Sequence, residues 1–196
     1  MPRSASLVLA AVAVLALSAC SGSNSDMAAN APPPAAAAPA PEAHPPAPEP
    51  ASTSPDQQFI DQAAAGGMAE VDLGRLAREK AGARDVRAFG ARMVADHTRA
   101  NNRLMALAKR LNMTPAGTPD PQQQSMHDQL AAASGADFDK QYIEGQVTAH
   151  QQTIQLFEGE AQGGQDAQLK RFARETLPTL RMHLRRAEAI AKRMGG

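Results

Sequence analysis

The chain has 196 residues, and its 20 Lys and Arg balance its 20 Asp and Glu, so it carries no formal net charge. This balance argues against a nucleic-acid-binding protein, which normally shows a basic excess. A single cysteine excludes an internal disulfide framework, and an aromatic content of 3% argues against a β-sandwich or barrel.

Residues 1–19 are typical of a signal peptide. One basic residue, Arg3, precedes an apolar run at 7–17 that is too short to span a bilayer. The next residues, Leu-Ser-Ala-Cys20, resemble a bacterial lipobox, so we expect cleavage before Cys20 and lipidation of its thiol. In a Gram-negative source, Ser21 after the cysteine favours the outer membrane. An ordinary signal peptide with an incidental cysteine is the alternative.

Residues 20–55 are expected to form a tether. Ten of the 15 prolines lie between Pro32 and Pro55, interleaved with alanine. Proline removes backbone donors, and the segment has no large apolar side chains to bury. We expect an extended, semi-rigid spacer of ~3.1 Å per residue that separates the lipid anchor from a folded domain at 56–196.

The rest of the chain predicts helices only. Apolar residues recur at alternating spacings of three and four, which is typical of amphipathic helices. The expected helices run over about 56–80, with Asp56 as N-cap, and then over 85–111, 122–133, 135–163 and 166–194. We expect Pro178 to kink the last helix or to open one of its backbone bonds.

Four long helices make a four-helix bundle the expected fold. Short turns join the helices in pairs, and a connection of about 22 residues, which contains the short helix, links the second to the third long helix. This is the topology of a ferritin-like all-α bundle. A simple up-down bundle with a decorated loop is the alternative.

One ionisable residue interrupts the apolar stripe of each long helix. These residues are Glu70, His97, His150 and His183. Each lies about 10 to 17 residues from either end of its helix, so a rise of ~1.5 Å per residue places all four near mid-height. We expect three imidazoles and one carboxylate to converge in one layer of the bundle.

Two interpretations of this layer stay open. Buried ionisable groups are costly unless they satisfy one another or bind something. In the first interpretation, Glu70, His97, His150 and His183 bind one transition-metal ion, with Zn, Fe, Cu and Mn all compatible with nitrogen and oxygen ligands. In the second, the layer is metal-free, and Glu70 hydrogen-bonds one or two histidines.

Three further residues are candidates to support the layer. Asp96 and Asn101 are placed to orient His97 from outside the ligand set. Tyr142, the only tyrosine, lies about two turns before His150 and could hydrogen-bond into the layer or simply pack.

Residues 56–194 contain an ordered set of motifs. They are Gly-Gly-Met-Ala-Glu70, Phe89-Gly-Ala-Arg-Met-Val-Ala-Asp-His97, Gly135-Ala-Asp-Phe-Asp139 with Tyr142 and His150, and Leu177-Pro178 with His183. Together these motifs resemble a family known as domain of unknown function 4142, whose members are often labelled outer-membrane proteins. The resemblance implies a ferritin-like fold and an exported, often lipid-anchored protein, but no activity.

The sequence departs from the di-iron pattern of the wider ferritin-like superfamily. Di-iron bundles use Glu-x-x-His pairs, whereas Val94, Val147 and Leu180 stand three residues before the three histidines. We therefore expect no ferroxidase, and no nucleophile or phosphate-loop motif predicts another enzyme. The expected protein is an envelope lipoprotein on the periplasmic face of the outer membrane. Its bundle either binds a metal ion or serves as a metal-free interaction module. We expect no nucleic-acid partner.

Overall fold

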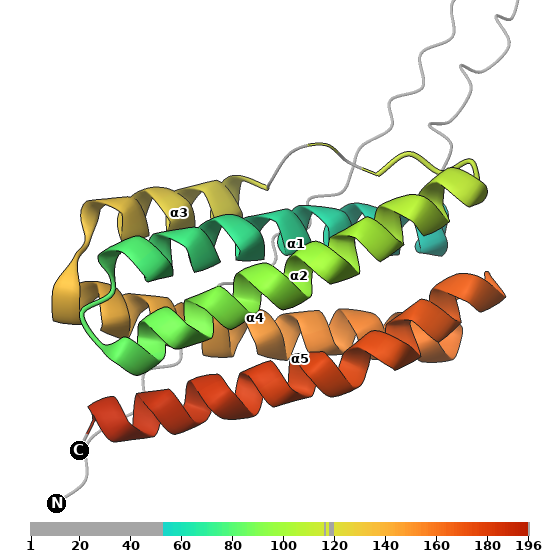
Figure 1. Cartoon of the computed structure of the whole chain (residues 1–196). Coiled ribbons are helices and arrows are strands. Elements are labelled where there is room, and N and C mark those ends of the chain that lie inside the picture. The colour runs from blue at the N-terminus through green and yellow to red at the C-terminus, as the bar shows by residue number, and fades with distance from the viewer. Residues whose placement is uncertain (1–52, 116, 118–119, 196) are drawn as a thin grey trace, which may run out of the picture. The chain divides into compact units, whose positions relative to one another are not determined.

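The computed structural model describes residues 53–115, 117 and 120–195, and every regular element in these ranges is a helix (Figure 1). The predicted signal peptide, Cys20 and nearly all of the predicted tether lie outside the described residues. The helices begin and end within a residue or two of the expected positions. They are α1 (Pro55–Lys80), α2 (Arg84–Arg110), α3 (Pro121–Ala132), α4 (Gly135–Gly163) and α5 (Ala167–Met194).

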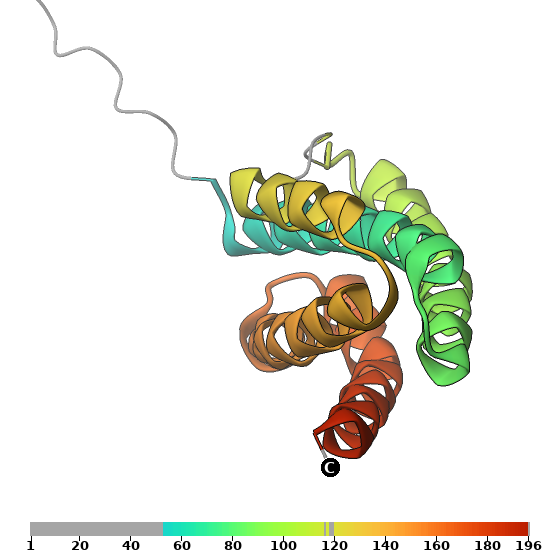
Figure 2. The ribbon, with the colours of Figure 1, turned by 90° about the vertical axis from the view of Figure 1, so that its left-hand side faces the viewer.

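The long helices form two antiparallel hairpins, α1–α2 and α4–α5, as Figure 2 shows end-on. α1 packs on α4 and α2 packs on α5, while α3 lies in the crossover against α1 and α4. α2 and α4 point the same way (Figure 1), as expected for two hairpins joined by a long crossover. The ferritin-like topology expected from the sequence is confirmed. Among the described helices, none is both long and apolar enough to cross a membrane.

The expected N-cap of α1 is wrong by two residues. Ser54 occupies the cap and accepts a hydrogen bond from the Gln57 N–H at 3.2 Å. Pro55 then takes the first helical position, where its fixed φ suits the helix and its missing N–H costs nothing. Asp56 therefore lies inside the first turn, and its side chain is buried.

Asp56 instead joins the two hairpins. Its carboxylate oxygens accept hydrogen bonds from the backbone N–H groups of residues 165 and 166, in the α4–α5 turn, both at 2.8 Å. Asp139, near the start of α4, makes the reciprocal contact with the N–H groups of residues 82 and 83, in the α1–α2 turn, at 3.0 and 2.7 Å. Each hairpin thus holds the turn of the other.

The second of these contacts lies at the start of a helix. α2 begins after Ala83, whose side chain cannot accept a hydrogen bond, so the N-cap residue itself offers no side-chain acceptor. Asp139 accepts from the N–H groups of Ala83 and of the residue before it, while the Asp85 carboxylate, inside the first turn, accepts from its own backbone N–H and the next one. In contrast, α5 is capped locally by Asp166, which accepts from the N–H groups of residues 168 and 169. α5 then continues through Pro178 to its end at Met194.

The apolar core is divided into two clusters. One contains Phe59, Leu104, Phe157, Phe172 and Leu180, among other residues. The second contains Leu73, Phe89, Met93, Phe138 and Tyr142, again among others. On every long helix the ionisable residue expected in the core lies between the residues of these two clusters. The polar layer therefore interrupts an otherwise apolar interior.

Candidate metal centre

The structure places all four predicted residues of the layer inside the bundle. Glu70 on α1 and His97 on α2 are each 7% exposed, His150 on α4 is 1% exposed, and His183 on α5 is fully buried. Each residue comes from a different helix because each occupies the inward-facing stripe of its own helix at mid-height. The three-four periodicity therefore predicted their burial correctly.

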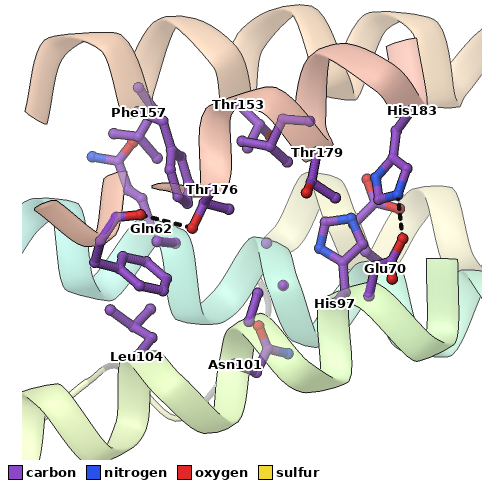
Figure 3. A pocket seen from close by; sticks show the side chains of 18 residues that line it. Gln62, Glu70, His97, Asn101, Leu104, Thr153, Phe157, Thr176, Thr179 and His183 are labelled. Atoms are coloured by element: carbon purple, nitrogen blue, oxygen red, sulfur yellow. Dashed lines mark hydrogen bonds and ion pairs between the residues drawn. The ribbon is translucent and has the colours of Figure 1, made fainter. Parts of the chain in front are cut away.

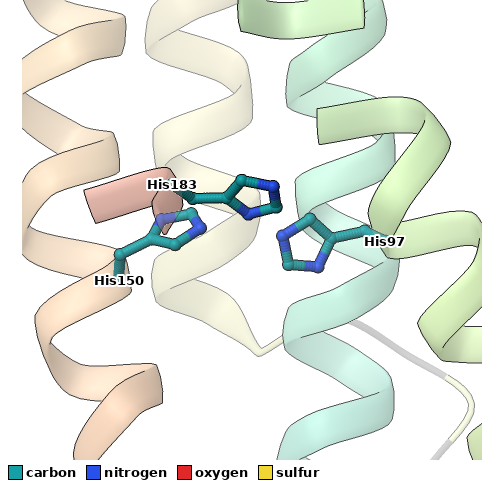
Figure 4. Close-up of side chains that lie close together, drawn as sticks. All are labelled: His97, His150 and His183. Atoms are coloured by element: carbon teal, nitrogen blue, oxygen red, sulfur yellow. The ribbon is translucent and has the colours of Figure 1, made fainter. Parts of the chain in front are cut away.

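The three histidines converge on one point (Figure 4). One ring nitrogen from each of His97, His150 and His183 lies within 4.8 Å of one from each of the others. The centroids of the rings are 5.4 to 5.7 Å apart. The rings do not stack as a parallel set, and the interplanar angles range from 38° to 78°.

Hydrogen bonds fix two of the three rings. His150 Nδ1 lies 2.9 Å from the carbonyl oxygen of Gln146, one helical turn earlier, and His183 Nε2 lies 2.9 Å from Asp96 Oδ2. Both partners are acceptors, so these two nitrogens carry the ring proton. The opposite nitrogens, His150 Nε2 and His183 Nδ1, then present lone pairs in the neutral rings.

The remaining nitrogens are buried without partners. His97 Nε2, His150 Nε2 and His183 Nδ1 have no hydrogen-bond partner within the described part of the chain. A buried polar atom without a partner costs about 1–3 kcal/mol. Three such atoms at the centre of one bundle are hard to reconcile with a layer that only satisfies itself.

Burial lowers the pKa of His97 and of His183. The pKa of His97 lies well below its ordinary value, first because burial removes water from the charged form and then because His150 and His183 would repel a second charge. Burial also lowers the pKa of His183, although its hydrogen bond to Asp96 opposes that shift. Neutral imidazole is the form that binds a metal ion.

Glu70 stands beside the triad and outside the convergent group. Its Oε2 accepts a 2.7 Å hydrogen bond from Gln146 Nε2, and its Oε1 lies 3.8 Å from His150 Nδ1. Burial raises the pKa of Glu70, while His150 and the bond from Gln146 oppose the shift. The structure thus brings three of the four predicted ligands together and places the carboxylate behind His150.

The supporting residues differ from the prediction in detail. Asp96 was expected to orient His97, but it bonds His183 instead, because its side chain leaves α2 toward α5. Arg92 and Arg99 hold the same carboxylate at 3.9 and 3.3 Å. Asn101 packs its side-chain amide against Gly67 of α1, where a Cβ would meet the amide oxygen.

Tyr142 packs and does not hydrogen-bond into the layer. Its ring is stacked on Phe138, with the centroids 5.6 Å apart, and meets Phe89 edge-on. Its hydroxyl is buried and has no partner in the ranges that the structure describes. Burial, with a smaller contribution from Glu70, raises the pKa of the hydroxyl well above its ordinary value.

Gln146 is the residue that the sequence interpretation missed. It is 1% exposed and bonds both Glu70, through its side chain, and His150, through its carbonyl. Its place four residues before His150, on the same helical face, was the available signal. A neutral glutamine on an apolar stripe is easily overlooked because it carries no charge.

Two cavities adjoin the layer. One of about 50 Å³ lies between the four long helices and is bordered by Glu70, His97 and His183 (Figure 3). The other, of about 160 Å³, lies under α3 and is bordered by Glu70, Gln146 and Tyr142. Glu70 lies on both walls.

The donor set fits a single transition-metal ion. Three neutral imidazole nitrogens with buried lone pairs are typical ligands of zinc and copper, and of iron or manganese when carboxylates join them. A di-iron centre does not fit, because Glu70 is the only glutamate that the described residues bring to the layer, and it is held by Gln146. The arrangement therefore defines a helical bundle with a buried tri-histidine centre.

The chain belongs to the family described as domain of unknown function (DUF4142), whose model matches residues 41–190. No curated protein matches the chain significantly. Among solved structures, a DUF305 fragment from Deinococcus radiodurans is 17% identical, with a TM-score of 0.64 over 74% of this chain and 99% of that one. A DUF305 protein from Streptomyces coelicolor is 12% identical, with a TM-score of 0.63 over 73% and 95%. CopM in its Cu(II)-bound form is 14% identical, with a TM-score of 0.61 over 70% and 96%. These likenesses confirm the fold.

Proposed function

We propose that this protein is a metal-binding lipoprotein of the cell envelope, whose bundle holds one transition-metal ion at His97, His150 and His183. The observation that carries the proposal is the convergence of three buried ring nitrogens that have no partners among the described residues. A metal ion would accept all three lone pairs at once and so remove their desolvation cost.

The fixed orientation of the rings supports the same conclusion. His150 and His183 each donate a hydrogen bond from their other ring nitrogen to an acceptor, which is the usual arrangement for a metal-binding imidazole. Asp96 adds a negative charge that is hydrogen-bonded to His183, and Glu70 adds a carboxyl group behind His150. Both offset the charge of a divalent cation in a buried site.

We propose zinc or copper as the natural ion. Both accept three imidazole ligands, and copper binds nitrogen sites more tightly than zinc in the general order of divalent metals. The Cu(II)-bound form of CopM shows that a bundle of this fold can carry copper, although at 14% identity it does not locate the ligands in this chain.

The anchoring part of the proposal rests on the sequence. The apolar run at 7–17, the lipobox that ends at Cys20 and the proline-rich segment together support a lipid-anchored domain on a spacer, on the periplasmic face of the outer membrane. Replacing Cys20 with Ser should move the protein from the membrane fraction to the soluble fraction. Retention in the membrane fraction would contradict the anchor.

Metal analysis of the purified protein tests the centre. The protein is stripped with a chelator, dialysed against Zn²⁺ or Cu²⁺ and analysed by elemental mass spectrometry. We expect about one ion per chain, and a rise in melting temperature that follows from stabilisation of about 2.7 kcal/mol at a free metal concentration of 100 Kd. The triple variant His97→Ala, His150→Ala, His183→Ala should bind none.

His127→Ala is the matched control. His127 lies on α3, its side chain is 39% exposed, and it contacts Asp128 outside the layer. This variant should bind metal as the unmodified chain does. Equal binding by the triple variant would disprove the ligand set. Absence of bound ion from the folded, unmodified chain would instead favour the metal-free layer, in which Glu70, Gln146 and the histidines only fix the register of the helices.

A further inference from the structure

The cavity of about 50 Å³ beside the triad is lined by two imidazoles and by threonines of α5. His97 and His183 form one end of it. On α5, Thr176, Thr179 and Leu180 lie seven, four and three residues before His183, so the helical repeat places them on the same face. In Figure 3, Thr179 lies between Thr176 and the two imidazoles.

Small residues of α1 create the space. Ala63, Gly66 and Gly67 border the cavity one to two turns before Glu70. Leu104 and Phe157 close its far end with apolar surface. The volume of about 50 Å³ corresponds to roughly three or four water-sized positions, since one such position takes about 10–15 Å³. A ligand of more than a few heavy atoms does not fit.

The triad leaves a metal with room for one more ligand from this side. Three protein donors converge among the residues that the structure describes, and three protein ligands are typical of sites that keep an exchangeable position. The two carboxylates beside the triad already have partners, since Glu70 accepts from Gln146 and Asp96 accepts from His183. Met93, one turn before His97, packs in the cluster of Phe89 and Tyr142 and so does not fill the cavity.

We infer that this cavity admits a small exogenous anion, of about three heavy atoms or fewer, to the metal held by the triad. The inference rests on the proposed metal centre. An anion is the expected ligand because it would bind the divalent cation directly, at the position that the three histidines leave open. Thr176 already donates to the Phe172 carbonyl at 2.7 Å, so its hydroxyl has no proton for an anion. Thr179, which lies nearer to the imidazoles, is the candidate donor to the far end of such a ligand.

Cobalt substitution with azide as the probe tests the inference. The purified chain is stripped of metal and loaded with Co²⁺, whose visible d–d bands report coordination. Azide, a linear three-atom anion, should shift these bands with saturation. Benzoate, which is too large for the cavity, should leave them unchanged.

Two variants, with one control, test whether the anion occupies this cavity. Ala100→Leu places a larger side chain on α2 within the cavity lining, and it should weaken the azide response at least about tenfold, because the anion loses its space. Ala88→Leu, at an exposed position on the same helix, is the matched control and should respond as the unmodified chain does. Thr179→Val keeps the side-chain volume and should raise the azide dissociation constant about threefold to tenfold, as expected for one lost hydrogen bond.

The outcomes separate the two proposals. If Co²⁺ bands are absent, the metal centre itself is disproved. If Co²⁺ bands are present but do not respond to azide, the centre stands and the inferred anion site is overturned. If Ala100→Leu folds and responds as Ala88→Leu does, the anion does not use this cavity. If Ala100→Leu does not fold, an unchanged azide affinity in Thr179→Val overturns the inference.

Discussion

Glu160, near the end of α4, is a buried carboxylate outside the metal centre. It is 5% exposed, and its Oε1 has no partner among the residues described. Burial, together with the negative charges of Asp56 and Asp166, raises its pKa to about 7, although Lys170 opposes the shift. The carboxylates of Asp56 and Asp166 accept hydrogen bonds from backbone N–H groups, whereas Glu160 Oε1 has no such partner among the described residues. The ionised form of Glu160 is therefore the one that the neighbouring negative charges disfavour.

This carboxylate predicts a pH-dependent stability. Between about pH 4.5 and pH 7 the folded chain holds a proton that the unfolded chain has released, so the free energy of unfolding falls as the pH rises through this window. We expect Glu160→Gln to stabilise the protein by about 1–2 kcal/mol at about pH 8, less than the full shift implies, because solvent near the end of the bundle screens the charges. The gain should vanish below about pH 4.5, where both forms are neutral.

Urea unfolding at both pH values measures the effect. Glu144→Gln, at an exposed position on the same helix, should change stability little at either pH. A gain for Glu160→Gln that is equal at both pH values would show that packing, and not charge, is responsible.

For single residues, the sequence predicted which side chains are buried better than it predicted their hydrogen-bond partners. Periodicity placed Glu70 and the three histidines inside, because a stripe of spacing three and four fixes which face of a helix is covered. It could not show that Asp96 reaches His183 and leaves His97, because that depends on the rotation of α2 against α5. Gln146 was missed because it carries no charge, and its contact with Glu70 could not be predicted because it joins two helices that are distant in sequence.

α1 and α2 approach each other closely at two glycines, Gly74 and Gly90. A Cβ built on Gly74 would lie 2.9 Å from the Gly90 carbonyl oxygen. A Cβ on Gly90 would lie 2.6 Å from the Ala77 Cβ and 2.8 Å from the Gly74 carbonyl oxygen. Both contacts involve backbone or the first side-chain atom, so neither can yield by a change of rotamer.

We therefore expect Gly90→Ala to destabilise the bundle by about 1–2 kcal/mol, because overpacking at a helix contact outweighs the better helix propensity of alanine. Gly159→Ala is the matched control, since a Cβ at this exposed position of α4 meets nothing within 4 Å. It should stabilise by about 0.5–1 kcal/mol. Chemical denaturation of both variants measures the difference, and stabilisation by Gly90→Ala would show that the helices can separate freely.

Helix ends were predicted well because local residues set them. Proline and glycine between the helices, and Asp166 as the cap of α5, act within a few residues of each boundary. The exceptions are two aspartates that accept hydrogen bonds from a distant turn. Asp56 was expected to cap its own helix but accepts from the α4–α5 turn, and Asp139 accepts from the N–H of Ala83, which lies 56 residues away in sequence.

For the whole molecule, the reciprocal contacts of Asp56 and Asp139 decide how firmly the hairpins are joined. We expect Asp139→Asn to lower the free energy of unfolding by about 1–2 kcal/mol, because an amide oxygen can replace only part of a carboxylate that accepts two N–H groups. Asp137→Asn, at an exposed position in the first turn of α4, should cost less than about 0.5 kcal/mol. Equal effects of the two variants would show that the contact with the α1–α2 turn adds nothing beyond a favourable charge at a helix start.

The same contacts have a consequence for the time course of folding. Each hairpin is built from helices adjacent in sequence, so its contacts can form early, whereas the Asp56 and Asp139 contacts join residues up to 110 positions apart. Interactions that form after the rate-limiting step govern how quickly the native state opens and leave the rate of its formation nearly unchanged. The contacts of these two aspartates would therefore slow unfolding without speeding folding. Weakening one of them in Asp139→Asn should shorten the lifetime of the folded bundle, while the refolding rate stays nearly unchanged.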